Sequence, residues 1–222
     1  MRESHPSPAR VLLYVPNIIG YLRIALAVIA FRQYRDSSRF FTAYLLGFLL
    51  DAADGLAARR LQQSSLFGAL LDMLTDRCSA MALVVVLGRS AILAPPQKWP
   101  VALRSRLPLA IVFICVALIL LDAVSHLLQM CAGLVVGSAS HKAASRLRLV
   151  QLYYTRWMLT TVCLLSELFL LLSYLLCVEM DRLGTVILKV CIGLWVACAP
   201  VYLFKQLVSA AQIHGTVQLL SR

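Results

Sequence analysis

Residues 51–77 read DAADGLAARRLQQSSLFGALLDMLTDR, and the rest of the chain is arranged around this stretch. It contains two pairs of aspartates, three residues apart in the first pair and four apart in the second, so each pair shares one face of a helix. A short polar break at residues 62–65 lies between the pairs and lets the chain turn back. The stretch therefore predicts a helical hairpin that brings together four carboxylates, those of Asp51, Asp54, Asp72 and Asp76.

This carboxylate group points to a metal. Four anions close together repel one another, and desolvation near a membrane adds to the energetic penalty. Divalent cations offset that repulsion, and hard oxygen ligands favour Mg²⁺, Mn²⁺ or Ca²⁺ over metals that prefer thiolates. We therefore expect a divalent-cation site near the open end of the hairpin.

The composition places the hairpin in a membrane protein. The chain is 61% hydrophobic and 14% charged, with a mean hydropathy of +0.83, and several apolar runs approach the roughly 20 residues that cross a bilayer. The net charge of +11 suggests nucleic acid in a soluble protein, but here the basic residues flank apolar segments and fit anionic lipid headgroups. We expect no nucleic-acid partner. The seven cysteines lie singly in apolar segments and are interpreted as packing residues.

The expected fold is all-α, with six transmembrane helices in a single domain over residues 1–222. The spans are expected at about 14–31, 40–61, 66–87, 109–136, 157–178 and 186–208, after a juxtamembrane segment at 2–13. An interfacial loop is expected at 94–108 and a polar connection at 137–156. Basic residues divide almost evenly between the two sides of these spans, so charge alone does not set the topology.

The spacing of the hairpin also carries a family resemblance. The stretch fits D-x2-D-G-x2-A-R-x8-G-x3-D-x3-D without a gap, at Asp51, Asp54, Gly55, Ala58, Arg59, Gly68, Asp72 and Asp76. This pattern resembles the signature of the CDP-alcohol phosphatidyltransferases, integral membrane enzymes that move a phosphatidyl group from CDP-diacylglycerol to an alcohol.

The resemblance implies roles for the site residues. The four aspartates would hold two divalent ions, Mg²⁺ or Mn²⁺, and Asp76 would act as the general base on the alcohol. CDP-diacylglycerol would be bound by Asn17, Arg23, Gly55, Arg59 and Ser65, the first two because they match the family's PN-x5-R opening.

Several of these residues have a second interpretation. Gly55 and Gly68 also suit close packing of helices, and the Ser65 hydroxyl also suits an N-cap of the following helix. Arg23 lies far inside a span, where it is costly without an anionic partner.

Other stretches bear on the acceptor alcohol. VPNIIGYLRI, FGALLDMLTDRCS, LDAVSHLLQM, GSASHK and LYYTR resemble the eukaryotic branch of the family that uses myo-inositol. Asp122, Ser125 and His126 share one helical face and are expected in the inositol pocket, followed by His141 and Lys142. A structural hydrogen bond within the bundle is an equal alternative for His126. The resemblance also implies a homodimer in the endoplasmic reticulum or Golgi membrane, with the active site facing the cytosol.

Two other functions compete with this one. A sister enzyme would use glycerol 3-phosphate, serine or inositol phosphate in place of inositol. A divalent-cation transporter, from a different class of protein, would use the carboxylates to line a path. Arg59 beside the acids opposes cation passage, and the acids gather at one end of the hairpin instead of following a path.

Overall fold

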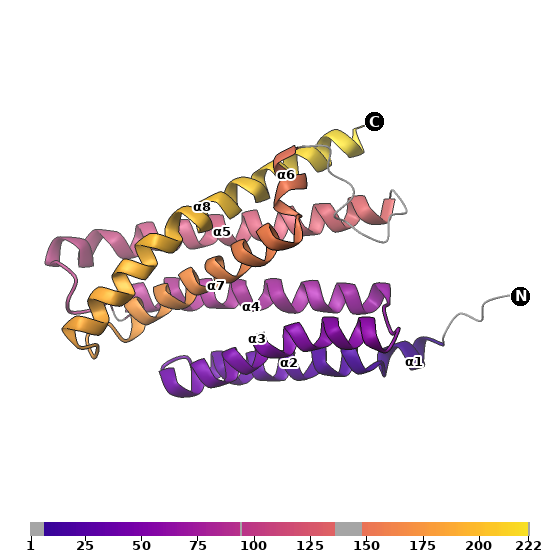
Figure 1. The fold of residues 1–222 in the computed structure, drawn as a ribbon. Helices are drawn as coiled ribbons and strands as arrows, with labels where there is room; N and C mark the ends of the chain where they lie inside the picture. The colour runs from indigo at the N-terminus through magenta and orange to yellow at the C-terminus, as the bar shows by residue number, and fades with distance from the viewer. Residues whose placement is uncertain (1–6, 94, 136–147, 222) are drawn as a thin grey trace, which may run out of the picture. The chain divides into compact units, whose positions relative to one another are not determined.

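The computed structural model describes residues 7–93, 95–135 and 148–221, and every regular element in these ranges is a helix (Figure 1). The prediction of an all-α protein is therefore confirmed. His141 and Lys142 lie outside the described residues. In chain order the helices are α1 (Pro8–Leu12), α2 (Val15–Arg32), α3 (Ser37–Arg60), α4 (Leu66–Leu93), α5 (Val101–Val135), α6 (Arg148–Tyr153), α7 (Arg156–Val178) and α8 (Thr185–Leu220).

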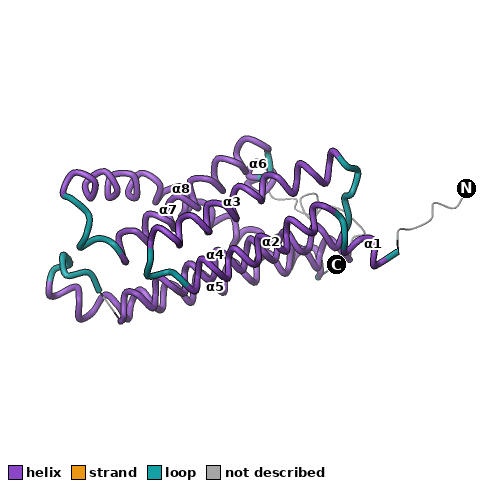
Figure 2. Tube along the Cα trace, turned by 90° about the horizontal axis from the view of Figure 1, so that it is seen from below, coloured by secondary structure: helices purple, strands orange, loops and turns teal. Residues whose placement is uncertain are grey.

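The helices form two compact units, Met1–Ala82 and Leu83–Arg222, and α4 contributes to both. In the first unit α2 packs along α3, to which a tight turn joins it (Figure 2). The Asp36 carboxylate accepts a hydrogen bond from Arg39 N and so caps the start of α3. Next to this turn the rings of Phe31, Phe40 and Tyr44 pack edge to face or tilted. These contacts fix the relative register of α2 and α3.

In the second unit α8 packs against α5, α6 and α7. Tyr153, Val162 and Val208 form a buried apolar cluster there. The connections are also tied together: the Asp181 carboxylate accepts from Gln97 N and Lys98 N, and Lys98 Nζ donates to the backbone of 180 and 183.

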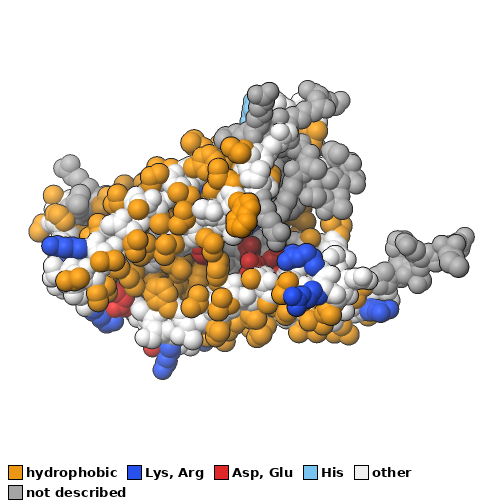
Figure 3. All heavy atoms as spheres, viewed as in Figure 1, with side chains coloured by type: hydrophobic (Ala, Val, Ile, Leu, Met, Phe, Trp, Pro, Cys, Tyr) orange, Lys and Arg blue, Asp and Glu red, His pale blue; other side chains and the backbone are white. Residues whose placement is uncertain are grey.

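Five described helices are long and apolar enough to cross a membrane: Val15–Arg32, Ser37–Arg60, Leu107–Leu134, Trp157–Val178 and Thr185–Leu219. Many large hydrophobic side chains are accordingly exposed, and they cover much of the face seen in Figure 3. The remaining long helix is α4, which corresponds to the third expected span and carries Asp72, Asp76, Arg77 and Arg89. These charges keep α4 out of the group of five. The chain is therefore an integral membrane protein with several apolar helices.

The sequence-based boundaries were wrong in three places. The expected loop at 94–108 overlaps α5, which begins at Val101 immediately after Pro100 and continues through Pro108. The expected connection at 137–156 contains α6. The last helix continues past residue 208 to Leu220, because Ser209, Gln212 and Thr216 are buried in the unit although they are polar. A boundary assigned from hydropathy alone places the end of the helix before such polar residues.

Candidate functional site

A single arginine lies at the centre of the four predicted carboxylates. Arg23 projects from α2 with 5% of its side chain exposed. Its Nη1 donates to Asp54 Oδ2 at 2.5 Å and to Asp72 Oδ1 at 2.8 Å. Its Nη2 lies 2.7 Å from Asp51 Oδ1 and also donates to Asp76 Oδ1. The structure therefore gives this intramembrane arginine the anionic partners that the sequence required.

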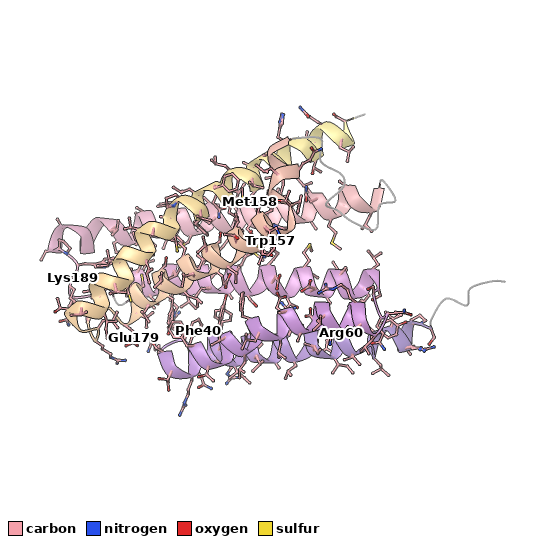
Figure 4. All side chains as sticks on the ribbon, in the orientation of Figure 1. Phe40, Arg60, Trp157, Met158, Glu179 and Lys189 are labelled. Atoms are coloured by element: carbon pink, nitrogen blue, oxygen red, sulfur yellow. The ribbon has the colours of Figure 1, made fainter. Side chains whose placement is uncertain are left out.

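Local helix geometry explains why these groups meet. Asp51 and Asp54 lie one turn apart near the end of α3, and Asp72 and Asp76 one turn apart near the start of α4. The turn at 61–65 reverses the chain, so the two pairs face each other. Figure 4 labels Phe40 and Arg60, which mark the first and last parts of α3. Asp51 and Asp54 thus lie in the half of α3 that ends at Arg60.

The charges in this cluster do not balance. Arg23 contributes one positive charge and Arg77, whose Nη2 lies 4.0 Å from Asp76 Oδ2, contributes a second, whereas the four carboxylates together carry four negative charges when ionised. Asp54 is the most enclosed, with 9% of its side chain exposed, and Asp51, Asp72 and Asp76 are 38%, 49% and 35% exposed. The excess negative charge therefore lies on the three accessible carboxylates.

These three carboxylates are suited to a cation. Asp51, Asp72 and Asp76 each offer one oxygen, and the three oxygens lie within 4.8 Å of one another. Ligands of one Mg²⁺ stand up to about 4 Å apart, and those of Ca²⁺ up to about 5 Å. An all-oxygen, anionic donor set fits these hard cations and not a thiolate metal. Asp54 is not part of this group; its side chain is the most enclosed of the four, and its Oδ2 contacts Arg23.

A cavity of about 140 Å³ opens beside the carboxylates. Three of the residues expected to bind the nucleotide-lipid line it, namely Asn17, Gly55 and Ser65. Further lining groups come from the same three helices and the turn, including Gly20, Asp54, Gln63, Ser64, Gly68 and Asp72. The structure thus brings the carboxylates together with a small cavity, lined by both polar and apolar residues, within the first unit.

Two glycines make this cavity possible. A Cβ on Gly68 would stand 2.9 Å from Asn17 Oδ1 and 3.1 Å from Ser65 Oγ, so any larger residue displaces both polar groups. A Cβ on Gly55 would stand 3.3 Å from Arg59 Nη1, which shows that the Arg59 guanidinium lies over Gly55. Arg59 itself is exposed, at the edge of the site.

Ser65 serves the start of α4. Its Oγ accepts a hydrogen bond from Gly68 N at 3.0 Å, the contact of an N-cap. The second interpretation of Ser65 is therefore correct, and the same residue also lines the cavity. Its position next to the carboxylates follows from the capping geometry.

Three of the five expected inositol residues, Asp122, Ser125 and His126, lie in the described part of the second unit and form a local group there. Ser125 Oγ donates to the Asp122 backbone oxygen at 3.0 Å, and His126 Nδ1 lies 2.9 Å from the same oxygen. The His126 ring is also 3.7 Å from Asp122 Oδ1. Asp122 and Ser125 are buried. The one-face prediction is confirmed, and these contacts of His126 with Asp122 run along one helix.

Sequence reasoning missed a second polar cluster in the same unit. Tyr154 OH donates to Gln129 Oε1 at 2.6 Å and accepts from Gln212 Nε2 at 3.0 Å. Gln129 and Gln212 are buried. The available signal was the polar spacing 205, 209, 212 and 216 on α8, which marks one helical face.

Comparison with known proteins places the chain among membrane transferases. The family model described as CDP-alcohol phosphatidyltransferase matches residues 13–220. A protein of Candida albicans named CDP-diacylglycerol–inositol 3-phosphatidyltransferase is 38% identical, over 96% of this chain and 84% of the relative. Relatives with that name from Homo sapiens and Saccharomyces cerevisiae are 41% and 35% identical, over 91% and 95% of this chain and 89% and 87% of their own lengths. No solved structure matches the chain.

Proposed function

Because the chain belongs to the CDP-alcohol phosphatidyltransferase family, we propose that it transfers the phosphatidyl group of CDP-diacylglycerol to myo-inositol, giving phosphatidylinositol and CMP. The relatives' names supply the donor and the acceptor. The observation that carries the proposal is the gathering of four carboxylates on one helical hairpin, beside a cavity that polar side chains line in part.

The carboxylates are the proposed metal ligands. Asp51, Asp72 and Asp76 would hold Mg²⁺ or Mn²⁺, and Asp54 would complete the ligand set for two ions. The chemistry that such ions supply is withdrawal of charge from the substrate pyrophosphate and stabilisation of departing CMP. Arg23 fixes the orientation of all four side chains, since each of them contacts its guanidinium.

Asp76 is the proposed general base. Its Oδ1 faces Arg23, whereas its Oδ2 lies 4.0 Å from Arg77 Nη2 and belongs to an accessible side chain. In the proposed step Oδ2 takes the proton of an inositol hydroxyl as the hydroxyl oxygen bonds to the lipid-linked phosphorus. The bond from that phosphorus to the CMP oxygen breaks, and CMP leaves with the electron pair. Asp54 is less suited to this role because it is enclosed and held by Arg23.

Donor and acceptor are assigned to different residues. Asn17, Gly55 and Ser65 line the cavity, which supports a role in binding the nucleotide end of CDP-diacylglycerol. Arg59 beside them offers a planar guanidinium that can bind phosphate through two N–H groups. Arg23 would act on substrate binding indirectly, by orienting the four carboxylates that it contacts. Asp122, Ser125, His126, His141 and Lys142 are proposed to form the inositol pocket.

The setting in the membrane is part of the proposal. We propose six spans, with α4 as the sixth, because pairing of its acids with Arg23 reduces the penalty for their burial. The chain would act as one domain over 1–222, as a homodimer in the endoplasmic reticulum or Golgi membrane with the carboxylates facing the cytosol. Glycosylation sites introduced into the α4–α5 connection and at the C-terminus test this topology.

One assay tests the acceptor. Purified protein in detergent is given CDP-diacylglycerol, Mg²⁺ or Mn²⁺, and one labelled acceptor: myo-inositol, inositol phosphate, glycerol 3-phosphate or serine. We expect a lipid product only with myo-inositol. A product with glycerol 3-phosphate and none with inositol would keep the family and reject the acceptor.

A further inference from the structure

The way α3 ends directs the side chain of Gln63 toward α2. Leu61 is the C-cap of α3. The next residue, Gln62, has a φ of 54°, in the left-handed region. Gln63 N then donates back to the Ala58 oxygen at 3.0 Å. A left-handed residue followed by such a backward bond is the Schellman ending of a helix. This ending turns the Gln63 side chain toward the start of α2.

Gln63 connects two helices through one oxygen. Its Oε1 accepts a hydrogen bond from Val15 N at 2.9 Å, and Val15 is the first residue of α2. The first N–H groups of a helix have no partner within that helix. Because Val15 N–H is a donor, it selects the oxygen of the Gln63 amide and fixes which way the amide faces. The Nε2 group is then turned away from Val15.

The Nε2 group of Gln63 keeps both of its N–H donors for a ligand. Gln63 lines the 140 Å³ cavity, and within the described residues its Nε2 has no hydrogen-bond partner. The other amide of the cavity, on Asn17, already uses one of its two N–H donors, which donates to the Val11 oxygen at 2.6 Å. Asp54 and Asp72, when ionised, only accept. A ligand that presents acceptor oxygens in this cavity therefore finds a neutral N–H₂ group at Gln63.

We propose that Gln63 is a positioning and binding residue for the nucleotide end of the substrate: its oxygen ties the turn to α2, and its Nε2 donates to a phosphate or cytosine acceptor. The inference rests on the proposed function, because it takes CDP-diacylglycerol as the ligand. A neutral donor suits this place, since it adds no positive charge to compete with cations for the nearby carboxylates.

Two substitutions separate the two halves of this role. Gln63→Glu keeps an oxygen for Val15 N–H but has no donor, whereas Gln63→Leu loses both. Gln62→Ala is the matched control, since Gln62 is an exposed neighbour that does not line the cavity. The probes are CMP and cytidine, titrated calorimetrically into the full chain in detergent with Mg²⁺, together with KM for each substrate and thermal unfolding.

Both Gln63 variants should bind CMP about tenfold more weakly, the effect of one lost hydrogen bond. KM for CDP-diacylglycerol should rise while KM for inositol is unchanged. Thermal stability should fall in Gln63→Leu but not in Gln63→Glu, and Gln62→Ala should bind as the wild type does. Weaker cytidine binding in Gln63→Leu assigns the contact to the base, and unchanged cytidine binding assigns it to phosphate.

Three results would overturn the inference. The first is wild-type CMP affinity in Gln63→Glu, which would leave only the tie to Val15. The second is a loss in Gln63→Glu that disappears in 1 M salt, where screening confines charge repulsion to about 3 Å. The third is failure of the wild type to bind CMP. By contrast, a wild type that binds CMP but makes no lipid from inositol rejects the proposed acceptor and leaves the role of Gln63 intact.

Discussion

In the first unit the Arg23 guanidinium meets four carboxylates, whereas in the second unit the Tyr154 hydroxyl joins two glutamine amides. Both clusters join side chains of several helices, but the first carries an excess of negative charge and the second is neutral. Tyr154 donates to Gln129 and accepts from Gln212, and both of these partners are neutral amides. A satisfied neutral network of this kind stabilises packing and asks for no ligand. The Arg23 cluster keeps an excess of acceptors and negative charge, which a further cation offsets.

This difference separates function from stability within one chain. Changes in the Arg23 cluster should act on turnover and on the response to metal. Changes in the Tyr154 cluster should act on unfolding and leave turnover unaltered below the unfolding temperature. The predictions below test that division, beginning with the largest effect.

Removing the proposed base should have the largest effect. Asp76→Asn keeps the size of the side chain and a hydrogen-bond acceptor for Arg23, but an amide does not take a proton from an alcohol. We expect turnover to fall by about 10³-fold, in the range attributed to a general base. The measurement is the initial rate of CMP release at saturating Mg²⁺.

The matched control is Asp36→Asn at the opposite end of α3. Asparagine is as good an N-cap as aspartate, so this variant should keep both its fold and its rate. A rate for Asp76→Asn within a few-fold of the wild type would remove Asp76 from the role of base.

The second prediction breaks the charge balance itself. Arg23→Gln leaves four carboxylates without their shared cation, and loss of one partner from a buried ion pair destabilises by about 3–5 kcal/mol. We expect a lower unfolding temperature that Mg²⁺ raises more in the variant than in the wild type. Unfolding in detergent across a Mg²⁺ titration measures both effects.

Arg60→Gln provides the control, because Arg60 is exposed at the end of α3, the helix that carries Asp51 and Asp54 (Figure 4). It removes the same formal charge without touching the cluster and should change little. If Arg23→Gln and Arg60→Gln unfold alike at every Mg²⁺ concentration, the cluster does not depend on Arg23.

The third prediction concerns the neutral cluster. Tyr154→Phe leaves the Gln129 and Gln212 amides without their common partner, and an unsatisfied buried polar group destabilises by about 1–3 kcal/mol. The unfolding temperature should fall, with no dependence on Mg²⁺ and no change in KM or turnover at low temperature. Tyr21→Phe is the control, since the Tyr21 hydroxyl bonds the Leu12 oxygen at an exposed site. A selective loss of turnover in Tyr154→Phe would make the neutral cluster functional.

The two clusters also differ in how far the sequence predicts them. The four aspartates lie in one stretch with helical spacing, so a local pattern predicted the carboxylate group. Arg23 lies in an apolar span, where it needs an acidic partner, so its position predicted an anionic neighbour. Gln129, Tyr154 and Gln212 are separated by 25 and 58 residues, and no local pattern relates them. The extension of α8 did carry a local signal, the polar face at 205, 209, 212 and 216, but the burial of that face arises only through tertiary packing.

The smallest predicted effect concerns the turn that presents the carboxylates. Gln62 has a φ of 54°, a conformation that costs a residue with a Cβ about 1 kcal/mol and costs glycine little. Gln62→Gly removes this strain but also loosens the unfolded chain, so the net gain should be at most about 1 kcal/mol. Turnover should not change, because Gln62 is exposed and does not line the cavity. Gln62→Ala retains the Cβ and should gain nothing. Thermal unfolding of the two variants side by side measures the difference.

Equal stability of glycine and alanine at this position would mean that the turn relaxes out of the left-handed conformation in the membrane. The hydrogen bond between Gln63 and Val15 would then need another source of rigidity.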